Sequence, residues 1–307
     1  MLEGALVICG PTASGKSGLA LELARYADIE IISADSAQVY RGMDIGTAKP
    51  TPDVLASVPH HLIDIREPSE PYSAADFRRD VIVSVSGIRE RARLPVIVGG
   101  TMLYLKALKE GMADLPEADE ELRAEISREA SEAGWDALHR ELEFVDPEAA
   151  ARIRPSDTQR LQRAIEVYRL TGTSLSVLHR QTSAPCPFPL TEVAIMPSDR
   201  KALHEEIARR FHEMLDEGFT REVAALKRDP ANHAGLPAMK AVGYRQIWSF
   251  LEGETDRDTM IEQSLAATRQ LAKRQFTWLR SWQGLTRVEF PDLERVLKIL
   301  GRGTILR

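Results

Sequence analysis

Eight residues near the start of the chain have the types and the spacing of a phosphate-binding loop. Residues 10–17 read Gly-Pro-Thr-Ala-Ser-Gly-Lys-Ser. Gly10 and Gly15 allow a tight turn whose backbone amides face an anion, and a helix that follows adds its positive N-terminal end. Lys16 supplies a cation for the outer phosphate oxygens, and the Ser17 hydroxyl is placed to bind Mg²⁺. The segment predicts a phosphate site with Mg²⁺; a glycine-rich turn of purely structural value is the alternative.

Three further side chains could act on a ligand held there. Asp35 directly follows an apolar run, where a carboxylate can bind Mg²⁺, bind an acceptor hydroxyl, act as a general base, or only cap a turn. Thr101 follows two glycines at the end of another apolar run, although those glycines could serve backbone geometry alone. Arg210 lies beside Arg209 in a helical segment, where a surface pair and a phosphate contact are both open.

The elements that position these residues alternate between strand and helix over the first hundred residues. A helix is predicted over residues 17–27, and Ser73 with Asp76 forms a capping box at the start of another. Buried strands are predicted at residues 5–9, 29–33, 61–65, 95–98 and 193–196. This pattern predicts an α/β fold: a P-loop NTPase-like core with a mainly parallel sheet covered by helices.

The middle of the chain changes character. Residues 114–190 read as all-helical, with Ser156 and Gln159 as the capping box of one helix, and a proline-rich segment leads back to the core. We therefore expect a helical insertion domain at 114–190 within a core formed by 1–113 and 191–307. The last third of the chain reads as helical, and its final stretch gives no interpretable pattern.

Composition limits the class of protein. The 307 residues are 43% hydrophobic, enough for a sizeable core, and no apolar run reaches the roughly 20 residues of a membrane helix. Cys9 and Cys186 are the two cysteines, too few for a disulfide framework or a CxxC metal site, which suits a reducing, cytoplasmic setting. The net charge is −6, but residues 114–150 hold thirteen acidic residues against three arginines. The rest of the chain is therefore basic overall.

Two short segments concentrate positive charge. Residues 152–163 carry four arginines against one aspartate, and residues 269–280 carry four basic residues and no acid. In the second segment Gln275, Phe276 and Trp278 are interleaved with the charges, a composition that suits contact with an RNA backbone and stacking on bases. A solvated helix face is the other reading of each run.

Beyond the phosphate loop, the chain resembles the tRNA dimethylallyltransferases, the isopentenyltransferases of bacterial type, over roughly residues 5–285. The resemblance rests on segments spread along the whole of that range. They are GPTASGKS (10–17), ISADSAQVYRGMDIGTAKP (32–50), YSAADFRRD (72–80), VGGTMLY (98–104), RIRPSDTQRLQRAIEV (152–167), RRFHEML (209–215), VGYRQIWSFLEG (242–253) and TRQLAKRQFTWLR (268–280).

The resemblance implies a reaction. A dimethylallyl group would move from dimethylallyl pyrophosphate to the exocyclic N6 amine of the adenosine at tRNA position 37, 3′ of the anticodon, in tRNAs that read codons beginning with U. Asp35 would accept the amine proton, Thr101 would position the base or the pyrophosphate, and Arg210 would contact the leaving pyrophosphate. By the same resemblance the pyrophosphate site comprises Gly10, Thr12, Ala13, Ser14, Gly15, Lys16 and Ser17, with Ser17 on Mg²⁺.

Partners follow from the same resemblance. We expect the tRNA anticodon stem-loop and dimethylallyl pyrophosphate as substrates, no membrane partner, and a monomer. The residues expected to contact tRNA are Asp35, Ser36, Ala37, Gln38, Thr101, Arg123, Gln159, Arg160, Arg163, Lys240, Arg245, Lys273 and Arg280. Three other functions stay open: a P-loop kinase for a small metabolite, a prenyltransferase acting on free adenine nucleotide, and a non-catalytic RNA-binding NTPase.

Overall fold

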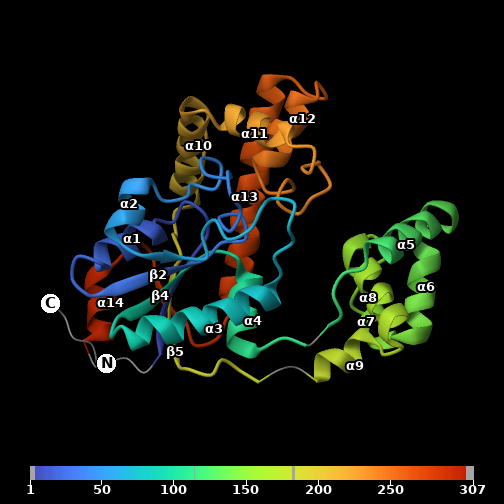
Figure 1. Ribbon diagram of the computed structural model, residues 1–307, viewed down its shortest axis with the longest axis horizontal. Helices are drawn as coiled ribbons and strands as arrows, with labels where there is room; N and C mark the ends of the chain where they lie inside the picture. Colours follow the sequence, from blue (N-terminus) through green and yellow to red (C-terminus); the bar gives the residue numbers. More distant parts are fainter. Residues whose placement is uncertain (1–3, 114, 182–183, 302–307) are drawn as a thin grey trace. The chain divides into compact units, whose positions relative to one another are not determined.

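The computed structural model describes residues 4–113, 115–181 and 184–301, and a six-stranded sheet lies at its centre (Figure 1). Neighbouring strands all pair in parallel, in the order β3-β2-β4-β1-β5-β6. The strands are β1 (Ala5–Cys9), β2 (Ile29–Ala34), β3 (His60–His61), β4 (Leu94–Gly99), β5 (Leu190–Ile195) and β6 (Thr286–Val288). Parallel neighbours need crossover connections, and each crossover here contains a helix. The predicted α/β class with a mainly parallel sheet is confirmed.

The chain divides into two compact units, one formed by Met1–Lys109 with Cys186–Arg307 and the other by Glu110–Pro185. The helices of the first unit are α1 (Lys16–Leu23), α2 (Pro52–Ser57), α3 (Ala74–Glu90), α4 (Met102–Glu110), α10 (Arg200–Glu217), α11 (Phe219–Arg228), α12 (Tyr244–Leu251), α13 (Arg257–Ser281) and α14 (Leu293–Leu300). The second unit therefore begins and ends slightly earlier than the insertion expected at 114–190, whose residue 114 lies outside the described ranges.

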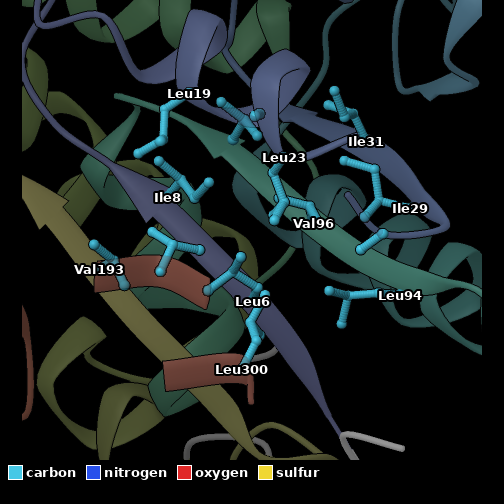
Figure 2. Packing of buried hydrophobic residues seen from close by; sticks show 14 of the residues in the cluster. Leu6, Ile8, Leu19, Leu23, Ile29, Ile31, Leu94, Val96, Val193 and Leu300 are labelled. Atoms are coloured by element: carbon cyan, nitrogen blue, oxygen red, sulfur yellow. The ribbon is translucent and has the colours of Figure 1, made fainter. Parts of the chain in front are cut away.

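Helices cover both faces of the sheet. Figure 1 shows α1 and α3 on opposite sides of β2 and β4, and α3 packs directly on both strands. Figure 2 shows Leu6 and Ile8 of β1 with Leu19 and Leu23 of α1 in one cluster, which Leu300 of α14 also joins. Burying such a leucine contributes about 1.5–3 kcal/mol. This packing fixes the start of α1, and with it the loop that precedes the helix.

The second unit is helical over the residues that the structure describes and has its own core. Its helices are α5 (Glu120–Ala133), α6 (Trp135–Val145), α7 (Pro147–Ala150), α8 (Thr158–Thr171) and α9 (Leu175–Arg180). Ile126, Leu138, Leu142, Leu161 and Ile165 are buried together at its centre. In neither unit do the described residues form a helix long and apolar enough to cross a membrane.

Two expectations about the sheet are corrected. The strand expected at 61–65 pairs only at His60–His61, because Leu62 and Asp64 adopt positive φ angles of 61° and 55° that end the extended conformation. The C-terminal stretch is not featureless, because Thr286–Val288 forms β6 and pairs with β5. The helix α14 that follows packs on α1, while residues 302–307 lie outside the described ranges. A three-residue strand is too short to show a periodic pattern.

Of the two predicted capping boxes, one is confirmed and the other is wrong. Ser73 and Asp76 form the predicted capping box of α3: the Asp76 amide donates to Ser73 Oγ at 3.1 Å and the Ser73 amide donates to Asp76 Oδ2 at 3.0 Å. The box predicted from Ser156 and Gln159 is wrong, since α8 begins one residue later and Asp157 caps it by accepting from the Arg160 amide. Aspartate and serine cap about equally well, so adjacent candidates cannot be ranked by type.

Candidate active site

Strand register brings three loops to one edge of the sheet. Cys9 of β1 and Ala34 of β2 both pair with Gly99 of β4, so the three strands end at the same level. The loop after β1 is the predicted phosphate loop, the loop after β2 begins with Asp35, and the loop after β4 leads to Thr101. Ligands of parallel α/β sheets bind beyond the carboxyl ends of the strands, which is where these loops meet.

The phosphate loop has the backbone that its sequence requires. Gly15 has a φ of 83°, a conformation natural to glycine, and the following residue begins α1. Lys16 Nζ donates to the carbonyl of Pro11 at 3.2 Å, so the lysine folds back over the loop. Ser14 is buried, and its hydroxyl finds no hydrogen-bond partner among the described residues. An unpaired hydroxyl inside an amide-lined turn is a donor available to an anion.

Two cations and one carboxylate share the space above the loop. Desolvation lowers the pKa of Lys16 to about 8; the Asp35 charge opposes this shift and the Arg210 charge adds to it. Desolvation also lowers the pKa of Arg210, again against the charge of Asp35. A bound anion would stabilise the charged forms of both side chains, because it compensates for their lost hydration and offsets their mutual repulsion. This end of the site is therefore built for a negatively charged group.

Arg209 and Arg210, adjacent in sequence, have different surroundings. Arg209 is exposed and forms ion pairs with Glu206, at 2.6 Å, and with Glu213. Arg210 lines the cavity instead. The structure thus separates a surface arginine from one that faces the loop.

Asp35 and Thr101 are held together by a short network. The Ala37 amide donates to Asp35 Oδ1 at 2.9 Å, which turns the chain just after the strand. The Ser36 amide donates to Thr101 Oγ1 at 3.0 Å, and the Thr101 amide donates to the carbonyl of Ala34 at 3.2 Å. The threonine hydroxyl thereby fixes the loop that carries Asp35.

These groups line one cavity of about 480 Å³ in the first unit. Of the residues predicted from sequence, the cavity lining includes Thr12, Ala13, Lys16, Ser17, Asp35, Ser36, Ala37, Gln38, Thr101, Arg210 and Lys240. Apolar walls come from α10, α11 and α13, through Ile207, Phe211, Phe219 and Leu271. A lining that combines charged and apolar side chains suits a substrate that has a charged head and a hydrocarbon tail.

Gly46, Thr47 and Ala48, from a loop at residues 44–49, form a further part of the cavity lining. The carboxylate of Glu222 accepts from the amides of Asp44, Ile45 and Gly46, at 2.9, 2.7 and 3.2 Å. The hydroxyl of Tyr244 donates to the same carboxylate at 2.5 Å. We call this arrangement the Glu222 clamp. It holds Gly46 and its neighbours where they line the cavity.

Two more side chains secure the same wall. Lys49 is almost fully buried, donates to the carbonyl of Tyr40 and forms ion pairs with Asp44 and Asp64 at 2.5 and 2.6 Å. Gln38 donates through Nε2 to the carbonyl of Thr47 at 3.2 Å and to the carbonyl of Ala48 at 3.3 Å, and its Oε1 accepts from Ser33 at 2.8 Å. The side-chain carboxamide of Gln38 therefore stabilises this part of the cavity wall.

Comparison with known proteins decides the family. Residues 38–282 match the family described as IPP transferase. The chain belongs to the IPP transferase family. A tRNA isopentenylpyrophosphate transferase from Bacillus halodurans is 36% identical, with 98% of this chain and 95% of that chain covered and a TM-score of 0.69. The Staphylococcus epidermidis tRNA delta(2)-isopentenylpyrophosphate transferase is 32% identical, with 97% of each chain covered and a TM-score of 0.67.

A eukaryotic dimethylallyltransferase acting on tRNA shares the fold, with a TM-score of 0.79 at 23% identity over 99% of this chain and 80% of that chain. The phosphate loop precedes the segment matched to the family, but the bacterial structures cover nearly the whole chain and so include it.

Other predicted contact residues of this IPP transferase lie outside the cavity. Arg245, Lys273 and Arg280 are exposed and do not line it. Gln275 and Phe276, expected on the same basic face, are buried, so the exposed face of α13 is narrower than the sequence suggested.

In the second unit, Arg123 and Arg163 both bind the fully buried carboxylate of Glu166, at 2.9 and 2.7 Å. These two arginines therefore have a structural partner. Gln159 and Arg160 are exposed and line a shallow concavity at the start of α8 with Arg154.

Proposed function

We propose that this protein transfers a dimethylallyl group from dimethylallyl pyrophosphate to the N6 amine of the adenosine at tRNA position 37 and releases pyrophosphate. One observation carries the proposal: the anion-binding end formed by Lys16 and Arg210 opens into the same cavity as Asp35 and Thr101. Membership of the IPP transferase family and near-complete alignment with bacterial enzymes described as acting on tRNA support it.

The donor end stabilises the leaving group. As the amine nitrogen forms a bond to the allylic carbon, the carbon–oxygen bond breaks and its electron pair goes to pyrophosphate. Negative charge therefore grows beside the loop amides, Lys16 and Arg210, and fixed cations that face developing charge lower the barrier. The unpaired hydroxyl of Ser14 adds a further donor in the same turn.

The acceptor end removes a proton. The exocyclic amine of adenine is a weak nucleophile, so its orientation matters as much as its deprotonation. Asp35, held by the Ala37 amide, is placed to accept the amine proton as the new bond forms. The exposed Ser36 and the hydroxyl of Thr101 lie next to it, where they would orient the base. The target base must leave its loop stack to enter, at a cost of a few kcal/mol.

Mg²⁺ is part of the proposal. Ser17 lines the cavity, but the described residues offer no cluster of three or more His, Cys, Asp or Glu that could hold a metal. Mg²⁺ commonly takes one or two protein oxygens and completes its octahedron with phosphate oxygens and water, so the Ser17 hydroxyl fits such a site. Bound there, the ion would neutralise charge on the leaving pyrophosphate.

The partner surface is also proposed. On the first unit, the exposed Lys240, Arg245, Lys273 and Arg280 would hold the RNA backbone. On the second unit, Gln159 and Arg160 would do the same, with Arg123 and Arg163 acting through the part of each side chain left open by Glu166. We propose further that the protein acts as a monomer in the cytoplasm, where the free thiols of Cys9 and Cys186 would persist.

The decisive test follows label from dimethylallyl pyrophosphate into an unmodified anticodon stem-loop with three consecutive loop adenosines, with Mg²⁺ and without ATP. We expect transfer to one adenosine and loss of transfer in Asp35→Asn, with stem-loop affinity kept. Asp53→Asn makes the same change on exposed α2 and should transfer normally.

The competing functions give different results in the same assay. Label moving from ATP to a small molecule would indicate a kinase, and transfer to AMP but not to the stem-loop would indicate a free nucleotide as acceptor. RNA-stimulated ATP turnover without prenyl transfer would indicate an RNA-binding NTPase. Each of these outcomes contradicts the proposal.

A further inference from the structure

A buried glutamine on α13 joins two of the loops at the edge of the sheet. Gln275 is 7% exposed and lies in the cavity wall. Its Oε1 accepts from the amide of Thr12 at 2.9 Å, and its Nε2 donates to the carbonyl of Gly100 at 2.9 Å. One carboxamide thus binds the phosphate loop with one end and the loop after β4 with the other.

The second of these loops leads to the acceptor end of the cavity. Gly100 precedes Thr101, whose hydroxyl accepts from the Ser36 amide and so holds the segment that carries Asp35. The side chain of Gln275 therefore connects the phosphate loop to the loop that leads to Thr101 and, through it, to the segment that carries Asp35. Both of its partners are backbone atoms, so the connection fixes the path of the two loops directly.

We propose that Gln275 is a positioning residue for the transfer step, which sets the spacing between the pyrophosphate site and Asp35. The inference rests on the proposed function. Transfer requires the amine nitrogen, the allylic carbon and the leaving oxygen to be aligned, and a misplacement of about 1 Å can cost about 100-fold in rate. Gln275 acts through the backbone of residues 12 and 100 and takes no part in bond making.

Two variants and one control test the inference. Gln275→Met has a similar length but cannot donate. Gln275→Glu donates to Gly100 only when protonated, whereas its ionised form repels that carbonyl. Gln263→Glu makes the same change at an exposed position of α13. Rates are measured in single turnovers, with enzyme in excess and both substrates saturating.

We expect Gln275→Met to be slower than the unmodified protein by about tenfold or more at every pH from 5.5 to 9. The rate of Gln275→Glu, divided by that of the unmodified protein, should fall as pH rises, and Gln263→Glu should stay near unity. The charged groups that share the cavity are Lys16, Asp35, Arg210, Lys240 and Arg274, and division by the unmodified protein removes their own titrations. Stem-loop affinity should change less than threefold.

Three results would overturn the inference: Gln275→Met within threefold of the unmodified rate, a rate ratio for Gln275→Glu that does not depend on pH, or a loss explained by the unfolded fraction in urea titrations. Failure of the proposed function is recognised separately, because the unmodified protein then transfers nothing. Hydrogen exchange still tests the connection in that case: peptides covering 10–15 and 99–104 should exchange faster in Gln275→Met, and unchanged exchange there counts against it.

Discussion

Replacing Glu222 by glutamine should loosen one wall of the cavity without changing any residue that lines it. In the Glu222 clamp one carboxylate oxygen accepts from the amides of Asp44 and Ile45, and the other accepts from Gly46 and Tyr244. An amide group in its place turns one oxygen into a donor. The less costly orientation puts that donor toward the Tyr244 hydroxyl, which can accept, and leaves the Gly46 amide unpaired.

The magnitude follows from these bonds. Hydrogen bonds to a charged acceptor contribute about 1.5–3 kcal/mol each, against about 1 kcal/mol for neutral pairs. Losing one bond and weakening the remaining ones should lower the free energy of unfolding by about 2–4 kcal/mol. We expect a fall of roughly 5–10 °C in melting temperature and slower prenyl transfer, because Gly46 and its neighbours line the cavity.

Urea titration followed by tryptophan fluorescence measures the stability, since three of the four tryptophans, Trp248, Trp278 and Trp282, belong to the first unit. Glu217→Gln, an exposed change at the end of α10, is the matched control. Equal urea midpoints for Glu222→Gln and Glu217→Gln would refute the clamp. A lower midpoint with unchanged kcat/KM would refute its link to the cavity.

Three further predictions test other parts of the structure. In Gly46→Ala the new Cβ would lie 2.0 Å from Cε2 of Phe219, so the melting curve should show a loss of about 1–3 kcal/mol. Because the pKa of Lys16 is lowered to about 8, the lysine loses its charge as pH rises through that value. Calorimetry should therefore show that pyrophosphate binds about tenfold more weakly at pH 9 than at pH 7, after division by the same ratio measured for Lys16→Arg. Hydrogen bonds from Arg91 lower the pKa of Glu30 to about 2, so the stability that this carboxylate gives is complete above pH 4.5 and is lost as pH falls toward 2. The free energies of unfolding from urea titrations at pH 6 and pH 3 should therefore differ less in Arg91→Ala than in the unmodified protein.

The central residues of the site could be predicted because the parallel arrangement of the strands determines where they lie. Once the strands that end at Cys9, Ala34 and Gly99 belong to one parallel sheet, the loops that follow them must meet at one edge. Asp35 and Thr101 therefore became candidates without any knowledge of tertiary contacts. The phosphate loop was recognisable because its function requires fixed residue types at fixed spacing.

The supporting residues could not be predicted in the same way. Gln275 lies between Arg274 and Phe276 in a run without acids, where the pattern is that of a solvated face, yet its partners are residues 12 and 100. Glu222 likewise reads as an ordinary helix surface residue, although it binds three amides far away in sequence. A buried polar side chain is identified by the groups that satisfy it, and local periodicity contains no information about them.

Charge gave an ambiguous signal for a related reason. Arg163 belongs to the basic run at 152–163, and the structure gives it a partner in Glu166, whose carboxylate is completely buried. A local count of charges cannot see an acid that lies on the inner side of the same helix or on a neighbouring one.

The order of the strands has a consequence for folding during synthesis. β1 pairs with β4 on one side and with β5 on the other, but β5 follows the whole second unit in the chain. One edge of an entirely buried strand therefore stays unpaired on the ribosome until residues 190–195 emerge. The second unit has its own core and can fold in that interval, and the Cys186 amide donates to the Lys109 carbonyl at 3.3 Å where the chain leaves and returns. Once the second unit has folded, the chain between β4 and β5 behaves as a short loop. Most of the conformational entropy that must be lost to bring β5 onto β1 has then been lost before the two strands meet.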